Sequence, residues 1–263
     1  MEKPLTKHIN FDRPPLTLKE YEMKGGYSAV HKALRSMTPQ EVQRVVQESD
    51  LKGRGGAGFN TGMKWSFVPM NGQAKYPKYL VANADEMEPG TFKDRFLLEG
   101  NPHQLLEGMI LSAYAIQANI SYVFLRWAYK KAARLLLHAI DEAYRAGYLG
   151  KDILGSGFNL EMHLHTGVGR YMCGEETALL NALEGKRATP RAKPPFPQVS
   201  GLFGKPTIVN NVETLCNIPH IVSNGADWFK SLSVGDDSGT KLYGVSGRVR
   251  RPAVAAVRRC CIG

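Results

Sequence analysis

The chain has 263 residues, of which 43% are hydrophobic and 22% are charged, so it can bury the core of one large globular domain or two smaller ones. No apolar run reaches the ~18 residues of a transmembrane helix, and the first residues do not resemble a secretory signal, which predicts a cytoplasmic protein without direct membrane insertion. The net charge of +10 does not indicate a nucleic-acid partner, because its cations crowd residues 248–259 and a proline-rich loop instead of forming a helical stripe with aromatic residues.

Residues 1–50 predict a polar entry followed by short helices. Thr38 is a typical N-cap, with Pro39 at the first helical position. Val42, Val45 and Val46 then recur at helical spacing. We therefore expect a helix over residues 39–50.

A glycine-rich loop, residues 53–59, follows this helix. The pattern Gly53-x-Gly55-x-x-Gly58 matches the dinucleotide fingerprint, but that fingerprint requires a preceding strand, and here a helix precedes it. Glycines leave the backbone open to a phosphate or a flat ring, and Lys64 lies close by in the sequence. The loop therefore predicts a nucleotide or flavin cradle of another kind, with a surface turn as the alternative.

The middle of the chain alternates between strand and helix patterns. Predicted strands cover residues 79–82, 121–125 and 160–165, and predicted helices cover residues 102–118, 129–146, 175–183 and 211–217. This order predicts an α/β fold with a parallel sheet and covering helices. Residues 241–249 predict one more strand, which would open another small domain because a single strand cannot bury itself.

Polar groups follow the first of these strands. Asn83, Asp85, Glu86 and Glu88 stand within six residues of one another, and carboxylates this close are costly to bury unless donors meet them. Ribose or ribityl hydroxyls would be suitable donors. A solvated acidic turn is the alternative interpretation.

Three later segments also suggest an anionic ligand. A glycine turn leads through Tyr171 and Gly174 to the acidic helix start at Glu175 and Glu176, which favours either N-capping or a ligand at the helix end. Residues 186–197 form a stiff basic loop suited to pyrophosphate. Asn210, Asn211 and Thr214 then supply polar side chains at another helix start.

The cysteines do not indicate a metal site. Cys173, Cys216, Cys260 and Cys261 form no C-x-x-C pair, and adjacent cysteines do not readily chelate one metal. We expect no metal ligands in this chain and no disulfide framework.

Four separated segments closely resemble one family in sequence and in order. They are GRGGAGFNTGMKWSF, NADEMEPGTFKDR, GRYMCGEETALLNALEGKRATPRAKPPFP and GKPTIVNNVETLCN. The family is the NADH-binding, FMN-carrying subunit of respiratory NADH:quinone oxidoreductase (complex I). The resemblance covers roughly residues 17–250. It implies a Rossmann-like sheet domain over residues 63–232, preceded by a helical and glycine-loop region (1–62) and followed by the start of a β-rich domain (233–263).

The resemblance also implies ligands, residue by residue. Those for FMN are Gly53, Gly55, Lys64, Asn83, Asp85, Glu86, Tyr171, Gly174, Glu175, Asn210, Asn211 and Thr214. Those for NADH are Phe59, Phe67, Glu88, Glu176, Lys193 and Phe196. The implied reaction is hydride transfer from NADH to FMN, followed by single-electron transfer to iron–sulfur clusters, which needs no catalytic side chain. Glu176 would also disfavour NADPH by repelling its 2′-phosphate.

The family pattern departs from this chain at its end. Family members continue into a helical bundle that ligates a [4Fe–4S] cluster, and those cysteines are absent here. Residues 253–263 lose the family pattern and resemble a frameshifted or prematurely ended reading frame. The implied partners are the thioredoxin-like [2Fe–2S] subunit and the large iron–sulfur subunit, on the cytoplasmic face of the inner membrane.

Two other interpretations stay open. The diaphorase subunit of an NAD-linked hydrogenase or formate dehydrogenase shares this flavin domain. A truncated fragment without catalytic activity is the second alternative.

Overall fold

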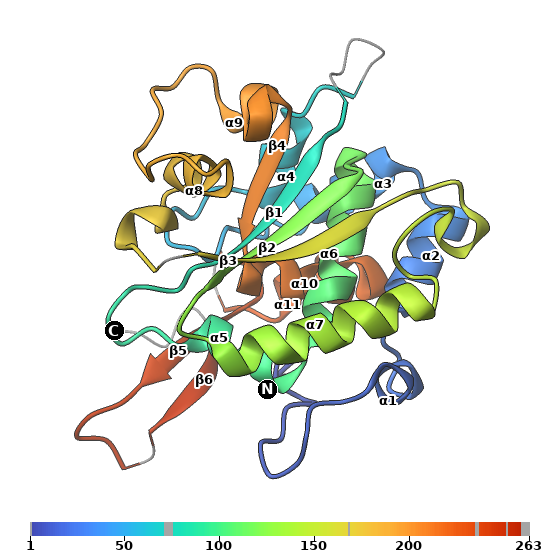
Figure 1. The fold of residues 1–263 in the computed structure, drawn as a ribbon. Helices are drawn as coiled ribbons and strands as arrows, with labels where there is room; N and C mark the ends of the chain where they lie inside the picture. The colour runs from blue at the N-terminus through green and yellow to red at the C-terminus, as the bar shows by residue number, and fades with distance from the viewer. Residues whose placement is uncertain (1, 71–75, 168, 235–236, 251, 259–263) are drawn as a thin grey trace.

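A four-stranded parallel sheet forms the centre of the computed structural model, which describes residues 2–70, 76–167, 169–234, 237–250 and 252–258 (Figure 1). The strands are β1 (Tyr79–Ala84), β2 (Ile120–Arg126), β3 (Glu161–Gly167) and β4 (Thr207–Asn211), in the order β3-β2-β1-β4. In register, Ala82 pairs with Val123 of β2 on one side and with Asn210 of β4 on the other. The predicted α/β fold with a parallel sheet is confirmed.

The strands predicted from the sequence are β1, β2 and β3, whose ends differ from the expected ones by a few residues at most. The sequence analysis missed β4, which runs without a break into helix α10 (Val212–Asn224). The helix predicted over 211–217 is therefore longer than expected and continues through Pro219. A five-residue strand that joins a helix directly leaves no turn signal between the two, so sequence periodicity did not separate them.

Alternate residues of β1 face two different helical layers. Leu80, Ala82 and Ala84 belong to the larger hydrophobic cluster, together with residues of α6 (Pro102–Ile116), α7 (Lys130–Arg145) and α10. Tyr79 and Val81 belong to a smaller cluster, with residues of α8 (Glu176–Leu183). This alternation follows from the two-residue period of a strand and places helices on both faces of the sheet (Figure 1).

The N-terminal part of the chain forms four short helices, α1 (Leu18–Met23), α2 (Ser28–Ser36), α3 (Pro39–Glu48) and α4 (Thr61–Ser66). The helix predicted at Pro39 is α3, and Thr38 caps it in a capping box with Glu41. Buried residues of α1–α4 join the larger cluster beside α6 and α10. The division of the chain into three domains stays a prediction.

Beyond α11 (Ala226–Ser231), the chain forms a separate two-stranded antiparallel sheet of β5 (Thr240–Val245) and β6 (Ala253–Arg258). The single strand predicted over 241–249 is therefore shorter, and β6 was not predicted. Helix α5 (Lys93–Gly100), the one-turn helix α9 (Pro197–Ser200) and short 3₁₀ helices at Ile153–Gly155, Tyr171–Gly174 and Leu202–Gly204 complete the described chain. Cys260 and Cys261 lie outside the described residues.

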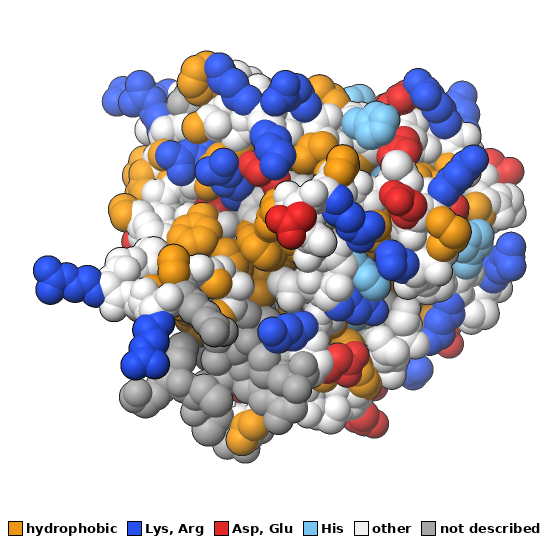
Figure 2. Space-filling view, turned by 90° about the horizontal axis from the view of Figure 1, so that it is seen from below, with side chains coloured by type: hydrophobic (Ala, Val, Ile, Leu, Met, Phe, Trp, Pro, Cys, Tyr) orange, Lys and Arg blue, Asp and Glu red, His pale blue; other side chains and the backbone are white. Residues whose placement is uncertain are grey.

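Within the described ranges, none of the helices has the length and apolarity required to cross a bilayer. On the face seen in Figure 2, Lys and Arg side chains are scattered among Asp, Glu and apolar side chains instead of forming one stripe. Cys173 and Cys216 are buried as free thiols, and no group of three or more His, Cys, Asp or Glu side chains in the described chain could hold a metal ion.

Candidate functional site

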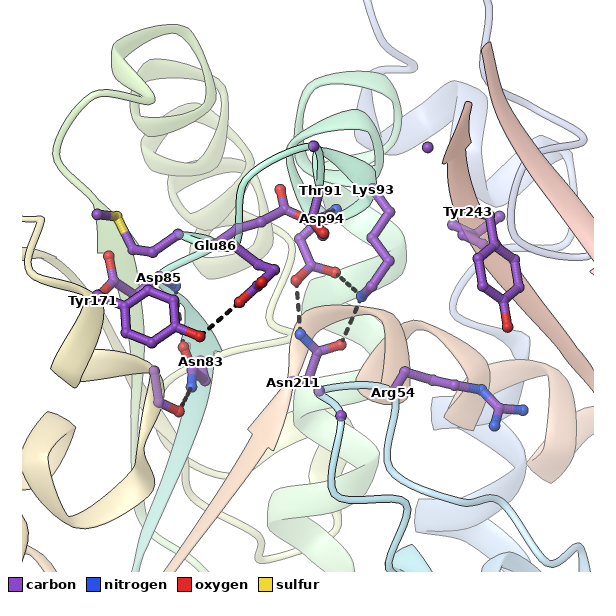
Figure 3. Close-up of a pocket in the computed structure, with 18 of the residues that line it drawn as sticks. Arg54, Asn83, Asp85, Glu86, Thr91, Lys93, Asp94, Tyr171, Asn211 and Tyr243 are labelled. Atoms are coloured by element: carbon purple, nitrogen blue, oxygen red, sulfur yellow. Dashed lines mark hydrogen bonds and ion pairs between the residues drawn. The ribbon is translucent and has the colours of Figure 1, made fainter. Parts of the chain in front are cut away.

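A cavity of about 590 Å³ opens at the carboxyl ends of the strands (Figure 3). Its walls come from the end of β1, the segment after β3, the end of β4, the glycine loop and β5. The strand order places β1 between β2 and β4, so the connections from β1 and β4 leave on different paths. In open α/β sheets, this switch point is where ligands bind.

Half of the predicted ligand residues line this cavity. They are Gly55, Asn83, Asp85, Glu86, Glu88, Tyr171, Gly174, Glu175 and Asn211. The other predicted residues do not line it, namely Gly53, Phe59, Lys64, Phe67, Glu176, Lys193, Phe196, Asn210 and Thr214. The lining also includes residues that the sequence analysis did not select: Arg54, Gly56, Met87, Gly90, Thr91, Lys93, Asp94, Met172, Lys241, Leu242, Tyr243 and Gly244.

The glycine loop lies between α3 and α4, so the expectation that it does not follow a strand is confirmed. The Arg54 N–H donates to the Thr214 hydroxyl oxygen at 2.9 Å, which ties the loop to the first turn of α10. At Gly55, a Cβ would lie 3.2 Å from the Asn211 Cβ, so even alanine would crowd this contact. The loop can pack this closely only because residue 55 has no side chain.

Asp85 is the most unusual polar group of the cavity. Its side chain is buried, and both carboxylate oxygens lack a hydrogen-bond partner among the described residues. Burial raises the pKa of Asp85 to about 6, and Arg126 offsets only part of that effect. A buried carboxylate without donors is costly, so this position suits a ligand that brings N–H or O–H groups.

Asn83 and Glu86 have internal partners beside Asp85. The Asn83 side chain accepts from the Asp85 N–H at 3.1 Å and donates to the Gly174 carbonyl, also at 3.1 Å. The Glu86 carboxylate accepts from the N–H groups of Asp94 (2.9 Å) and Arg95 (3.1 Å), at the start of α5. Burial raises the pKa of Glu86, with Asp94 adding to the effect. Both side chains therefore shape the wall around Asp85.

One contact crosses the mouth of the cavity. The Tyr171 hydroxyl donates to the Glu88 carboxylate at 2.6 Å, joining the segments that follow β3 and β1. Tyr171 is 62% exposed, so its ring is available to a ligand that enters from solvent.

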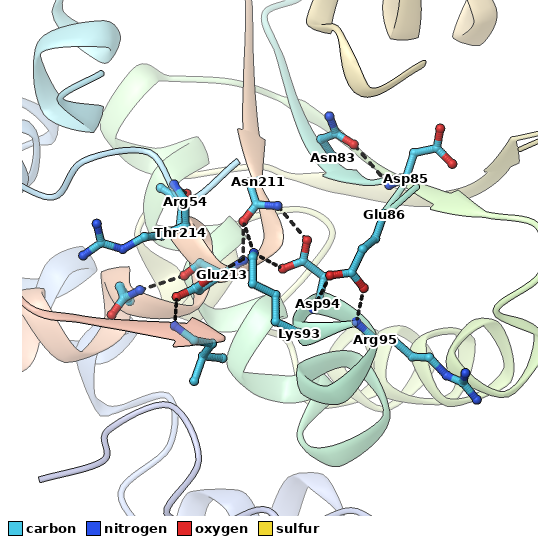
Figure 4. A network of polar contacts seen from close by, with 12 residues as sticks. Arg54, Asn83, Asp85, Glu86, Lys93, Asp94, Arg95, Asn211, Glu213 and Thr214 are labelled. Atoms are coloured by element: carbon cyan, nitrogen blue, oxygen red, sulfur yellow. Dashed lines mark hydrogen bonds and ion pairs between the residues drawn. The ribbon is translucent and has the colours of Figure 1, made fainter. Parts of the chain in front are cut away.

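A buried polar cluster forms the floor of the cavity (Figure 4). The Lys93 ammonium contacts Asp94 at 2.8 Å, Glu213 at 2.9 Å and the Asn211 amide oxygen at 3.3 Å. The Asn211 amide nitrogen donates to the other Asp94 oxygen at 2.7 Å. Burial alone would lower the pKa of Lys93, but the two carboxylates outweigh it and raise that pKa, so the ammonium stays charged. Lys93 and Asp94 lie within the second of the four family segments, but only the packing of α5 against α10 shows that they meet Asn211.

The remaining predicted residues occupy two places next to the cavity. Lys64 contacts the Glu176 carboxylate at 2.6 Å, and Lys193 contacts Glu175 at 3.2 Å and Glu176 at 3.3 Å, so these side chains form one chain of ion pairs. Glu175 also caps α8, as the N-capping interpretation predicted. Phe59 and Phe67 lie 6.3 Å apart between ring centroids, and both are about half exposed, as is Phe196.

Asn210 and Thr214 are engaged inside the protein. The Asn210 side-chain oxygen accepts from the Trp65 indole N–H at 2.9 Å, and Thr214 supports the glycine loop. Gly53 closes that loop by donating to the Phe59 carbonyl at 2.9 Å. These contacts support the cavity wall, and the direct ligand roles of the three residues stay predictions.

The fold and the cavity together define an α/β protein with a nucleotide-type ligand site at the carboxyl edge of a parallel sheet. Comparison with known families is consistent with this class, since residues 46–220 match the family model described as the Nuo51 FMN-binding domain. The chain belongs to this family, which confirms the resemblance found in the sequence.

Two similar curated proteins are the corresponding subunits of NADH-quinone oxidoreductase in two bacteria. The relative in Buchnera aphidicola subsp. Acyrthosiphon pisum (strain APS) is 57% identical over 252 residues. The relative in Escherichia coli (strain K12) is 55% identical over 251 residues. Each match covers 95% of this chain, whereas the chain spans 57% and 56% of the length of these relatives.

A solved structure is also similar. The NAD⁺-reducing [NiFe]-hydrogenase in the H₂-reduced state matches with a TM-score of 0.79 and 41% identity, over 87% of this chain and 38% of the hydrogenase chain. At this identity and TM-score, the two chains share the fold described above.

Proposed function

We propose that this chain binds FMN in the cavity and takes part in the oxidation of NADH, as a module of an NADH:quinone oxidoreductase. The observation that carries the proposal is the buried Asp85 carboxylate without a partner in the described chain, in a cavity at the sheet switch point. A volume of about 590 Å³ falls in the usual range for a ligand of FMN size. The family membership and the identity to the NADH-quinone oxidoreductase relatives support the same interpretation.

The residues present fit FMN. The Asp85 carboxylate would accept hydrogen bonds from ring N–H or ribityl O–H groups, which offsets the cost of its burial. Gly55 and Gly56 bring backbone without side chains to the cavity, which suits a phosphate or a ring. Bound FMN would supply hydride-accepting chemistry and the ability to release electrons singly.

The chain's own residues would bind and orient the two reactants. Tyr171 and Glu88 stand at the mouth, where a dinucleotide would replace their mutual hydrogen bond. The exposed rings of Phe59, Phe67 and Phe196 would stack on adenine, and the ion-paired Lys193 would contact the dinucleotide phosphates. Holding the nicotinamide against the flavin site lowers the entropic part of the barrier, and no side chain has to act as acid or base.

The wider context is part of the same proposal. Within complex I, the chain would sit peripherally on the cytoplasmic face of the inner membrane, beside the thioredoxin-like [2Fe–2S] subunit and the large iron–sulfur subunit. Electrons would then pass to iron–sulfur clusters and quinone. The similarity to the NAD⁺-reducing hydrogenase supports a second candidate, the diaphorase subunit of such an enzyme. Co-purification with either set of partner subunits would decide between them.

The test is flavin binding by the purified chain. FMN is titrated while its fluorescence is recorded, and NADH:ferricyanide reduction is then measured on the loaded protein. We expect saturable quenching and FMN-dependent activity. Asp85→Asn should weaken FMN binding by about tenfold, the value of a charge-assisted hydrogen bond. Asp227→Asn, at an exposed position of α11, is the matched control and should bind like the wild type. A wild-type chain that does not bind FMN would contradict the proposal and favour the non-catalytic fragment.

A further inference from the structure

Strand β5 forms one wall of the cavity although it lies outside the four-stranded sheet. Residues Lys241, Leu242, Tyr243 and Gly244 all line the cavity. The Leu242 N–H donates to the Glu213 carboxylate at 2.8 Å, and the Leu242 side chain is buried. This contact anchors β5 to the first turn of α10.

A close backbone contact anchors the same strand from the other side. At Gly244, a Cβ would lie 2.9 Å from the Phe92 ring and 3.0 Å from the Gly90 carbonyl oxygen, so β5 packs directly on the segment before α5. Because α10 and this segment both hold β5, the strand presents Lys241 and Tyr243 to the cavity from a fixed position.

The cationic side chains that line the described cavity differ in what they already contact. Lys93 uses its three donors on Asp94, Glu213 and Asn211. Arg54 donates from Nη2 to the Ser238 carbonyl at 2.9 Å. Lys241 has no ion pair with any described residue, and its ammonium lies 5.3 Å from the centroid of the Tyr243 ring. Lys241 is therefore the cation with its charge most available to an anionic ligand.

The charges of the cavity also have a direction. Asp85, Glu86, Glu88 and Glu175 come from the segments after β1 and β3, whereas Lys241 comes from β5. In Figure 3, Asp85 and Tyr243 lie on opposite sides of the Lys93–Asn211 pair. A phosphate dianion is repelled from the acidic side, and the hydroxyl and N–H donors of the same ligand are attracted to it.

We propose that Lys241 binds the phosphate of the flavin nucleotide, which orients FMN with its phosphate toward β5 and its ring and ribityl donors toward Asp85. This inference rests on the proposed FMN function. It makes β5 part of the flavin site, although the strand follows α10 and α11 in the chain and belongs to the separate β5–β6 sheet.

The experiment compares FMN with riboflavin, which has the same ring and ribityl chain but no phosphate. Dissociation constants are measured by fluorescence quenching at low ionic strength for the wild type, Lys241→Met and Lys241→Arg. Lys230→Met is the matched control, because it removes the same charge from an exposed position of α11 that does not line the cavity. All variants are compared with the wild type by circular dichroism.

We expect Lys241→Met to weaken FMN binding by about tenfold and to leave riboflavin binding unchanged, since a charged hydrogen bond to phosphate is lost and nothing else. Lys241→Arg should retain most of the FMN affinity, and Lys230→Met should match the wild type. Equal losses for both flavins, or no loss for either, would overturn the inference. So would a raised KM for NADH with an unchanged preference for FMN over riboflavin, because Lys241 would then contact the dinucleotide. A wild type that binds neither flavin refutes the proposed function itself.

Discussion

Asp85→Asn links the stability of the ligand-free chain to the chemistry of its cavity. Burial raises the pKa of the Asp85 carboxyl from 3.8 to about 6. A shift of this size corresponds to about 3 kcal/mol of differential stability. Solvent that reaches the open cavity screens the charge, so we expect about 1–2 kcal/mol to be measurable. Asparagine keeps the shape of the side chain and removes the charge.

The sign of the effect follows from linkage. A carboxyl with a raised pKa binds its proton more tightly in the folded chain than in the unfolded chain. Its contribution to stability is therefore fully present below about pH 4 and is lost as the pH rises through about 6. Asp85→Asn lacks this loss, so its free energy of unfolding relative to the wild type should rise by about 1–2 kcal/mol between pH 4 and pH 7.

Urea unfolding of ligand-free protein, followed by circular dichroism at several pH values between about 4 and 7, measures this difference. Asp227→Asn is the control and should show no comparable rise. Saturating FMN should reverse the order at neutral pH, because donors of the ligand then meet the wild-type carboxylate. A difference between Asp85→Asn and wild type that does not change with pH would refute the reasoning from burial.

Three further substitutions test other parts of the structure. Glu176→Ala should raise the ratio of NADPH to NADH activity by about fivefold to tenfold, because a negative charge near the 2′-phosphate is removed; an unchanged ratio in the ferricyanide assay speaks against this role. Gly108→Ala should destabilise the chain by about 3 kcal/mol, since its Cβ would lie 2.1 Å from the Leu215 carbonyl oxygen; a wild-type melting temperature would disprove this close contact. Thr38→Ala should cost about 1 kcal/mol of unfolding free energy through the lost cap of α3, and a smaller change than the error of urea unfolding would show that the cap is not needed.

Much of the sheet domain could be predicted from the sequence because its elements have strong local patterns. The apolar run before Asn83 and the helical spacing before Asp50 depend only on neighbouring residues, and both elements are present. The strand β4 could not be predicted in this way, since it is short and leads directly into α10. Its place beside β1 depends on pairing between segments far apart in the chain, such as Ala82 with Asn210, which no local pattern encodes.

The candidate site divides along the same line. The sequence by itself determined which polar and glycine residues end the strands and fill the loops, because residue type and spacing there report backbone freedom and charge directly. Only the tertiary structure decided that Asp85 is left without a partner in the described chain, that Lys93 is saturated by Asp94 and Glu213, and that Lys241 reaches the same cavity. These properties depend on which segments meet and on how much solvent they exclude, and both are set by packing between residues distant in the chain.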